Sequence, residues 1–157
     1  MKLFLLRHAE AESFSTTGSD FNRELSQRGN QQINQLGAFV NIVSKKTTLT
    51  VLCSSAKRTK QTFEGIKNDI EIESIRFIKE IYYADQQELL ELIKSIDDAK
   101  ENVLLIGHNN AISYFASHLI GEDIIFPTAG FVEINFPVVN RWKYIGADVG
   151  IIANKNF

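Results

Sequence analysis

Residues 2–8, Lys-Leu-Phe-Leu-Leu-Arg-His, open the chain with a short apolar run that stops abruptly at Arg7 and His8. Such a run predicts a buried strand that leads into a polar loop. Residues 49–54, Leu-Thr-Val-Leu-Cys-Ser, and residues 103–108, Val-Leu-Leu-Ile-Gly-His, have the same form. We therefore expect three buried strands, each followed by polar residues at its carboxyl end.

Segments with helical spacing lie between and after these strands. Ser26 is placed to cap a helix in which residues 33–43 carry apolar side chains on one face. Ser54 and Ser55 are expected to cap a second helix. Third and fourth helices are predicted around residues 89–96 and 112–119.

The remaining segments give weaker signals. Residues 13–25 are rich in small and polar side chains and predict a long loop. Residues 71–78 alternate apolar and polar side chains, as a strand does, and two more strands are expected near 130–136 and 140–146. The residues after Asp148 carry no signal that predicts an element.

Strands that alternate with helices predict an α/β fold, in which helices cover both faces of a mostly parallel sheet as a three-layer sandwich. The 157 residues contain no repeat, linker or low-complexity segment, so we expect a single domain spanning 1–157. Ligands of open α/β sheets bind beyond the carboxyl ends of the strands. Three such ends carry residues of catalytic type here: Arg7-His8, Ser54 to Arg58, and His108.

Composition narrows the class of protein. Apolar residues make up 44% and charged residues 23% of the chain, and the net charge of −2 gives no basic footprint for nucleic acid or an anionic membrane. No stretch approaches the roughly 20 apolar residues of a membrane span, and no signal-peptide core is present, so we expect a cytoplasmic protein. A single cysteine, Cys53, excludes a disulfide framework.

Arg7, His8, Arg58 and His108 would place two guanidiniums and two imidazoles at one edge of the sheet. A cluster of this kind favours an anion, and a phosphoryl group suits the planar fork of arginine best. A neutral imidazole can also attack phosphorus and form a covalent phosphoramidate. His118 shares a helix with apolar residues, so we expect it at a core boundary without a chemical role.

Each residue also has a purely structural interpretation. Arg7 and His8 could end a strand, and Arg58 could be a solvated residue in the first turn of a helix. Only four residues separate Cys53 from Arg58, whereas cysteine-dependent phosphatases have five, and Cys53 lies in an apolar run. We therefore expect Cys53 to be a small core residue. No spacing typical of a metal site occurs, so neither a metal nor a cofactor is expected.

Several motifs together resemble the histidine phosphatase superfamily, which has the phosphoglycerate mutase-like fold. The resemblance begins at Leu6-Arg7-His8-Ala9, continues through residues 23–29 and 54–62, and includes Leu105 to Asn109. Pro127-Thr128-Ala129-Gly130 resembles a segment of the phosphohistidine phosphatase branch. The motifs occur in order from residue 3 to about residue 135.

The resemblance implies a role for each matching residue. His8 would be the nucleophile that becomes phosphorylated, while Arg7, Arg58 and His108 would hold the phosphoryl oxygens. Glu80 would be a candidate proton donor, although an exposed Glu at a strand end is an equally good interpretation. Asn109 and Asn110 would be candidate substrate contacts.

Some positions depart from the family pattern. Ala9 replaces a glycine beside the nucleophile, and Ser55 replaces a common proline. Ala11 and Phe14 stand where phosphoglycerate mutases have a hydroxyl residue and an asparagine, so mutase activity is not expected.

Arg58 and His108 are only 50 positions apart in the sequence, which leaves no room for the helical cap of larger members. We therefore expect a minimal core without a cap insertion, whose open site admits a phosphorylated protein side chain. The leading hypothesis is a phosphatase that acts on protein phosphohistidine. A small-molecule phosphomonoesterase that uses Glu80 as its acid, and a phospho-ligand-binding module without turnover, are the alternatives.

Overall fold

The computed structural model describes residues 1–45 and 47–157. Its strands are β1 (Lys2–Arg7), β2 (Thr48–Ser54), β3 (Glu71–Ile78), β4 (Asn102–Gly107), β5 (Phe131–Asn135) and β6 (Ile151–Asn156). Its α-helices are α1 (Gln27–Ser44), α2 (Lys57–Ile66), α3 (Gln86–Lys94) and α4 (Ala111–Ile120). Four short 3₁₀ helices complete the described elements: η1 (Asp20–Asn22), η2 (Lys67–Asp69), η3 (Glu80–Tyr82) and η4 (Trp142–Tyr144).

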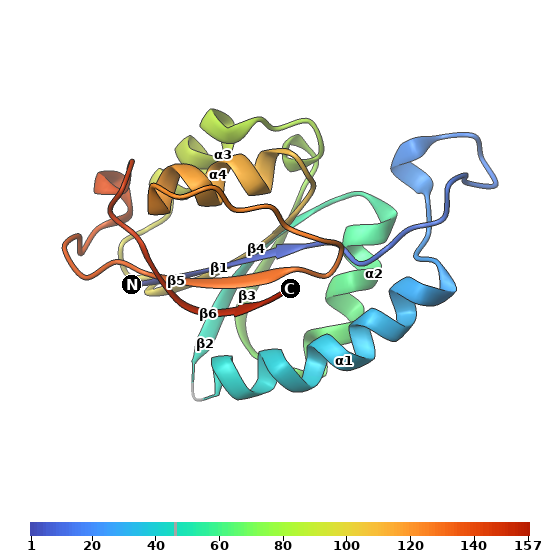
Figure 1. Ribbon diagram of the computed structural model, residues 1–157, viewed down its shortest axis with the longest axis horizontal. Coiled ribbons are helices and arrows are strands. Elements are labelled where there is room, and N and C mark those ends of the chain that lie inside the picture. Colours follow the sequence, from blue (N-terminus) through green and yellow to red (C-terminus); the bar gives the residue numbers. More distant parts are fainter. Residues whose placement is uncertain (46) are drawn as a thin grey trace.

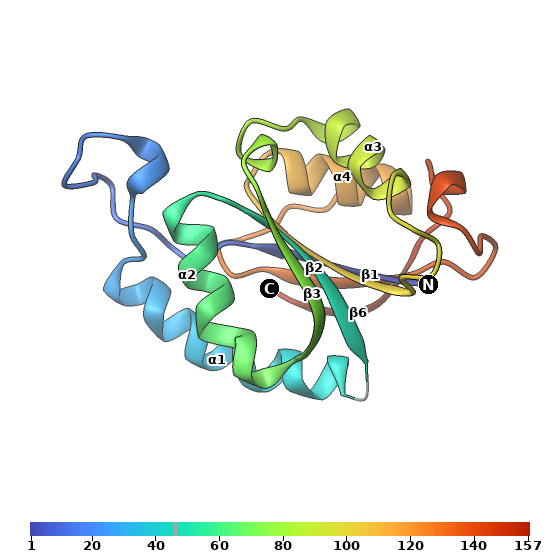
Figure 2. The ribbon, with the colours of Figure 1, turned by 180° about the vertical axis from the view of Figure 1, so that it is seen from behind.

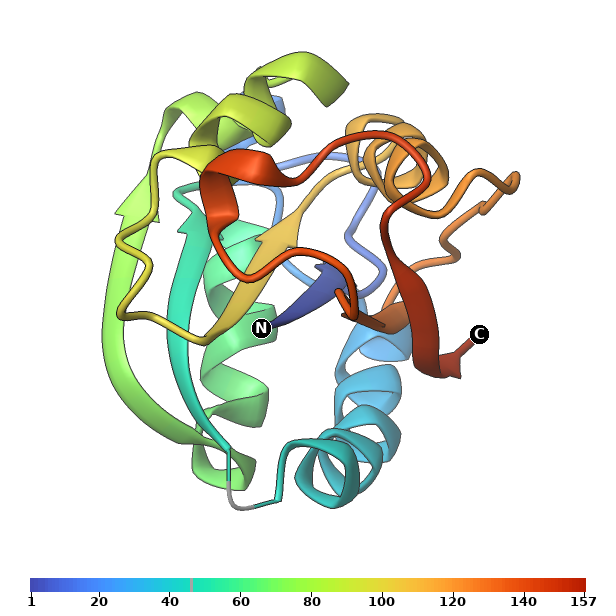
Figure 3. The ribbon, with the colours of Figure 1, turned by 90° about the vertical axis from the view of Figure 1, so that its left-hand side faces the viewer.

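The strands form one sheet of order β3-β2-β4-β1-β5-β6, with β3 and β6 at opposite edges (Figure 3). β3, β2, β4 and β1 are mutually parallel, β5 runs antiparallel to β1, and β6 runs antiparallel to β5. The four-residue apolar runs of β1 and β4 are fully buried, because both strands have neighbours on each side and helices above and below. The prediction of a mostly parallel sheet is confirmed.

Helices cover both faces of this sheet. α1 and α2 pack on one face, and α3 and α4 pack on the other (Figures 1 and 2). Each pair of helices buries a separate hydrophobic core against the sheet. The core under α1 and α2 includes Leu36 and Ile66, and the core under α3 and α4 includes Ile93 and Phe115. The expected three-layer sandwich is therefore confirmed, and in the described part of the chain only η2, β3, η3 and α3 lie between α2 and β4, with no cap.

The parallel register brings the carboxyl ends of the three central strands together. Arg7 at the end of β1 lies beside Gly107 at the end of β4, and the backbone N–H of His8 donates to the carbonyl of Gly107 at 3.1 Å. On the other side of β4, Cys53 in β2 lies beside Ile106. Ser54, His8 and His108 consequently leave the sheet at the same edge.

The start of α1 agrees with the prediction from the sequence, whereas the start of α2 differs from it. Ser26 caps α1, because its hydroxyl accepts the backbone N–H of Gly29 at 3.0 Å, as predicted. The predicted capping of α2 by Ser54 and Ser55 is wrong, since Ala56 is the N-cap and no side chain caps the helix. β2 continues to Ser54, whose hydroxyl lies 2.8 Å from the imidazole of His108.

The C-terminal part of the chain also differs from prediction. Residues 140–146 form a loop with η4 rather than a strand, because Trp142 is buried against the core and its indole N–H donates to the Lys100 carbonyl at 2.6 Å. The last strand is instead β6, after Asp148, which pairs with β5. Most β6 side chains are exposed, which explains why the sequence carries no apolar pattern there. In the described residues, no helix combines the length and apolarity that crossing a membrane requires.

Candidate active site

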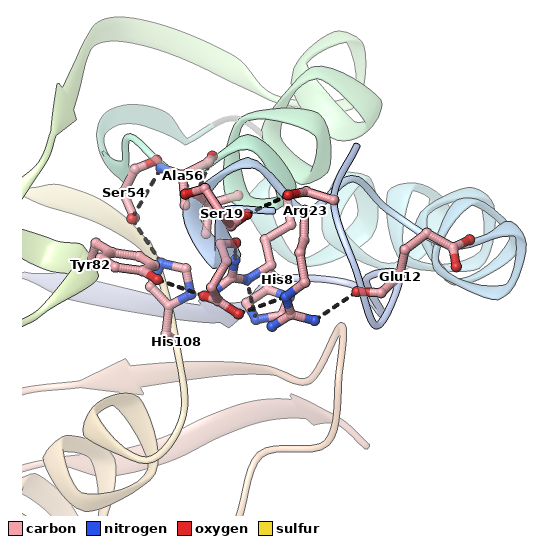
Figure 4. A network of polar contacts seen from close by, with 12 residues as sticks. His8, Glu12, Ser19, Arg23, Ser54, Ala56, Tyr82 and His108 are labelled. Carbon is pink, nitrogen blue, oxygen red and sulfur yellow. Dashed lines mark hydrogen bonds and ion pairs between the residues drawn. The ribbon is translucent and has the colours of Figure 1, made fainter. Parts of the chain in front are cut away.

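Three of the predicted residues, His8, Arg58 and His108, meet at the carboxyl edge of the sheet, where Figure 4 shows a network of polar contacts around His8 and His108. His8 follows β1, His108 follows β4, and Arg58 lies in the first turn of α2. The imidazole rings of His8 and His108 have their centroids 5.1 Å apart, and Nε of Arg58 lies 3.2 Å from Nε2 of His8. Arg7, the last residue of β1, is anchored separately by a bond from Nη1 to the Phe126 carbonyl at 2.7 Å.

The hydrogen bonds of His8 define its tautomer. Its Nδ1 lies 2.7 Å from the carbonyl oxygen of Ala9, which can only accept, so Nδ1 carries the proton. Nε2 is then the unprotonated nitrogen, and it accepts the Nε–H of Arg58. The Nε2 lone pair therefore points toward the Arg58 guanidinium, so a phosphoryl group bound by Arg58 would lie next to the nucleophilic nitrogen.

The electrostatics of the site keep both histidines neutral. Burial lowers the pKa of His8 to about 4; the hydrogen bond to Ala9 opposes this shift, and the charges of Arg58 and Arg7 add to it. Burial also lowers the pKa of His108 to about 3, with further lowering by His8 and Arg58. A neutral His8 is the nucleophilic form. A bound dianion would favour protonation of His108.

Two buried nitrogens of the cluster lack a hydrogen-bond partner in the described chain. Nε of Arg7 and Nδ1 of His108 have no hydrogen-bond partner among the residues that the structure describes. A buried polar atom without a partner costs about 1–3 kcal/mol, so a small rearrangement that pairs either nitrogen with an anion would be favourable. On the far side of its ring, Nε2 of His108 is held by the hydroxyl of Ser54.

The sequence alone does not reveal an acidic partner of this cluster. Asp20, the first residue of η1, accepts hydrogen bonds through its carboxylate from Arg58, Arg23 and Tyr82. The Tyr82 ring also stacks edge-on against His108, with centroids 5.3 Å apart, and lies 5.6 Å from the Arg58 guanidinium carbon. Asp20 lies in a polar loop without periodicity, so the only available signal was its position three residues before Arg23.

The structure places the three weaker candidates around the margin of the cluster. Glu80 begins η3 with an exposed side chain, and no hydrogen bond or ion pair within 1–45 and 47–157 joins its carboxylate to the cluster. Asn109 is half-buried, donating to the Phe126 carbonyl at 3.2 Å and accepting from Ser113 at 2.7 Å. Asn110 is exposed at the start of α4. Their roles stay predictions.

Cys53 and the family departures behave as structural residues. Burial raises the pKa of the Cys53 thiol to about 12, so it is not a thiolate, as predicted. Ala9 is fully buried and its backbone N–H donates to Thr62 Oγ1 at 3.0 Å, so its methyl group is accommodated. The N–H of Ser55 donates to the Ile78 carbonyl, a bond that proline could not make. Across the described chain, no group of His, Cys, Asp and Glu is arranged to hold a metal ion.

Comparison with known proteins identifies the family. The sequence model of the histidine phosphatase superfamily (branch 1) matches residues 3–96, more than half of the chain. The chain therefore belongs to this superfamily, and it is a phosphatase of that class. An uncharacterized protein of Mycobacterium leprae (strain TN) is 28% identical over 155 residues, which cover 89% of this chain and 91% of that protein.

Solved structures share the fold over nearly the whole chain. A protein described as the phosphohistidine phosphatase SixA from Agrobacterium tumefaciens superposes with a TM-score of 0.82 at 24% identity, covering 99% of this chain and 97% of that one. A protein described as an alpha-ribazole-5'-P phosphatase from Escherichia coli gives 0.69 at 16% identity, covering 96% and 100%. At these identities the similarity establishes the fold.

Proposed function

We propose that this protein removes phosphoryl groups from protein phosphohistidine through a covalent intermediate on His8. The observation that carries the proposal is the unprotonated Nε2 of His8, which lies 3.2 Å from Nε of Arg58 in a site that keeps the imidazole neutral. Arg7 and His108 each add to the cluster a buried nitrogen that lacks a hydrogen-bond partner within residues 1–45 and 47–157.

The first step transfers the phosphoryl group to His8. Nε2 attacks phosphorus with its lone pair, and the bond from phosphorus to the substrate imidazole breaks. The Nε–H of Arg58 turns from Nε2 to a phosphoryl oxygen, where it opposes the charge of the transition state. A substrate imidazole already protonated on its other ring nitrogen leaves as a neutral group, so this step needs no acid from the protein.

The second step hydrolyses phospho-His8. A water molecule attacks phosphorus, the bond to Nε2 breaks, and inorganic phosphate leaves. Nε2 regains its lone pair, and the proton lost by water passes to the phosphate. Throughout both steps Nδ1 of His8 keeps its proton, because the Ala9 carbonyl accepts it at 2.7 Å and holds the ring in one orientation.

A polypeptide substrate is supported by the surface beside the cluster. A groove of about 530 Å³ runs along α4 from Asn109 and Asn110 to Tyr114 and Ile125. Its wall is tied to the cluster, since the Phe126 carbonyl accepts hydrogen bonds from both Arg7 and Asn109. Tyr114 and Ile125 are 60% and 78% exposed, so the groove could receive residues that flank a phosphohistidine.

A small-molecule phosphomonoesterase is the second candidate, and Glu80 distinguishes it. An alkoxide leaving group needs a proton during bond cleavage, whereas an imidazole leaving group needs none. The test measures kcat/KM for a phosphohistidine protein and for sugar phosphates with wild type, Glu80→Gln, and Glu122→Gln as an exposed control. We expect phosphohistidine to be the better substrate and to be hydrolysed equally well by all three proteins. Faster ester hydrolysis that drops at least about a hundredfold in Glu80→Gln alone would replace the proposal with the second candidate.

A further inference from the structure

Asp20 accepts hydrogen bonds from the guanidinium of Arg58, the group that is expected to bind phosphate. Nη1 of Arg58 donates to the Asp20 backbone carbonyl at 2.8 Å, and Nη2 donates to the Asp20 carboxylate at 3.2 Å. The third nitrogen, Nε, donates to His8. All three nitrogens of Arg58 are thus bonded to the protein, and the two terminal ones both face Asp20.

Asp20 is an anion whenever the site is in use. The hydrogen bond from Tyr82 at 2.6 Å, together with the hydrogen bond from Arg23 and the charge of Arg58, holds the pKa of Asp20 at about 2. A carboxylate presents oxygen acceptors to a guanidinium much as a phosphoryl group does. Both anions therefore compete for the same face of Arg58, and they repel each other if both remain near it.

The segment that carries Asp20 is anchored at its two ends and is largely exposed between them, although the Phe21 ring packs edge-on against Tyr82. Its two ends are tied together, since the Glu12 N–H donates to the Glu24 carbonyl at 2.8 Å and Ala11 pairs with Leu25. Between these ties most side chains are exposed, and the side chain of Asp20 is 53% exposed. The loop that holds Asp20 therefore contacts the cluster through Asp20 and is otherwise largely exposed to solvent.

We propose that Asp20 is a resident competitor for the phosphoryl site, which a phosphoryl group must displace from Arg58 in order to bind. The proposal rests on the proposed function only in taking a phosphoryl group as the ligand. Free phosphate brings few contacts with which to displace Asp20, whereas a phosphorylated polypeptide adds contacts along the groove of α4. Asp20 is therefore a specificity-determining residue, which weakens the binding of small phosphates and of the product.

The competing interpretation is that Asp20 braces Arg58 in its productive orientation. The two roles predict opposite signs for one measurement, the affinity for inorganic phosphate. Removal of a competitor tightens phosphate binding, while removal of a brace weakens it.

The experiment titrates inorganic phosphate into wild type and Asp20→Asn by calorimetry at pH 7.5. We expect the Kd for phosphate to fall at least about tenfold in Asp20→Asn, because one like charge leaves the site while a side chain of similar size remains. Glu12→Gln is the matched control, because it removes one negative charge from the same loop, and the Glu12 carboxylate has no hydrogen bond or ion pair within the described ranges. Tyr82→Phe removes a hydrogen bond that holds Asp20 and should tighten phosphate binding by a smaller factor.

An unchanged or weaker affinity in Asp20→Asn would overturn the proposal, as would an equal gain in Glu12→Gln. If Asp20→Asn fails to fold, Tyr82→Phe decides by the sign of its change. Phosphate binding needs no turnover, so a protein that binds phosphate as expected yet fails to hydrolyse phosphohistidine contradicts the proposed function alone.

Discussion

Replacement of Arg58 by alanine probes how much the cluster stabilises the transition state. Arg58 is only 5% exposed, and its Nε–H lies closest to the nucleophilic Nε2 of His8. Loss of one preorganised donor to a developing oxyanion costs about 2.7–4 kcal/mol. We therefore expect kcat for phosphohistidine hydrolysis to fall roughly 10²–10³-fold in Arg58→Ala.

Arg58→Ala should also change the pKa values of His8 and His108 in the free protein. The Arg58 charge lowers the pKa of both histidines, so its removal raises those pKa values toward the ordinary value. Single-turnover kinetics on a phosphohistidine protein would give the rate of the chemical step, with Arg28→Ala as the control, because Arg28 is 72% exposed and pairs only with Glu10 in the described chain. A fall of less than tenfold in Arg58→Ala, with the fold intact, would refute the assigned role.

Four further predictions follow from the contacts of the site. Because burial lowers the histidine pKa values to about 4 and about 3, the ring signals of His8 and His108 should not titrate between pH 5.5 and 8 in NMR spectra of the free protein, and phosphate should raise the pKa of His108. The unfolded chain binds more protons than the folded one between about pH 6.5 and pH 4, so the free energy of unfolding in urea should decrease as the pH falls through that interval. Ser54→Ala removes the 2.8 Å partner of His108 and should lower kcat about tenfold with little change in KM, whereas an unchanged kcat would show that this contact does not position His108. Tyr114→Ala should raise KM for a phosphohistidine protein but not for a small phosphate. An equal effect on both substrates would show that the groove does not bind the polypeptide around the phosphohistidine.

The sequence predicted those parts of the fold that depend on burial. The four-residue apolar runs inside β1 and β4 are buried because both faces of these strands are covered, and a serine whose hydroxyl caps α1 precedes that helix. β6 could not be predicted, because an exposed edge strand is stabilised by backbone pairing with β5 and carries no apolar pattern. A strand was wrongly predicted near Trp142, because this residue is buried in a loop as fully as a strand residue is in a sheet.

The residues of the candidate site also divide into those that the sequence predicted and those that it did not. Arg7 ends β1, and His8 and His108 come directly after β1 and β4, so the parallel topology alone predicts that they lie at one edge of the sheet. Asp20 reaches Arg58 across 38 residues of sequence, and Tyr82 reaches Asp20 across 62. Such contacts depend on how a polar loop folds over the sheet edge, and no local pattern specifies them. Ser54 was expected to cap a helix, and its bond to His108 depends on the neighbouring strand.

The most direct test of covalent catalysis by His8 is to trap the phosphorylated protein. The protein would be mixed with a ³²P-labelled phosphohistidine protein, quenched in alkali within one turnover, and digested to locate the label. We predict acid-labile and alkali-stable phosphate on His8, and neither label nor turnover in a folded His8→Ala protein. Turnover that persists in His8→Ala, or label found on another residue, would contradict covalent catalysis by His8.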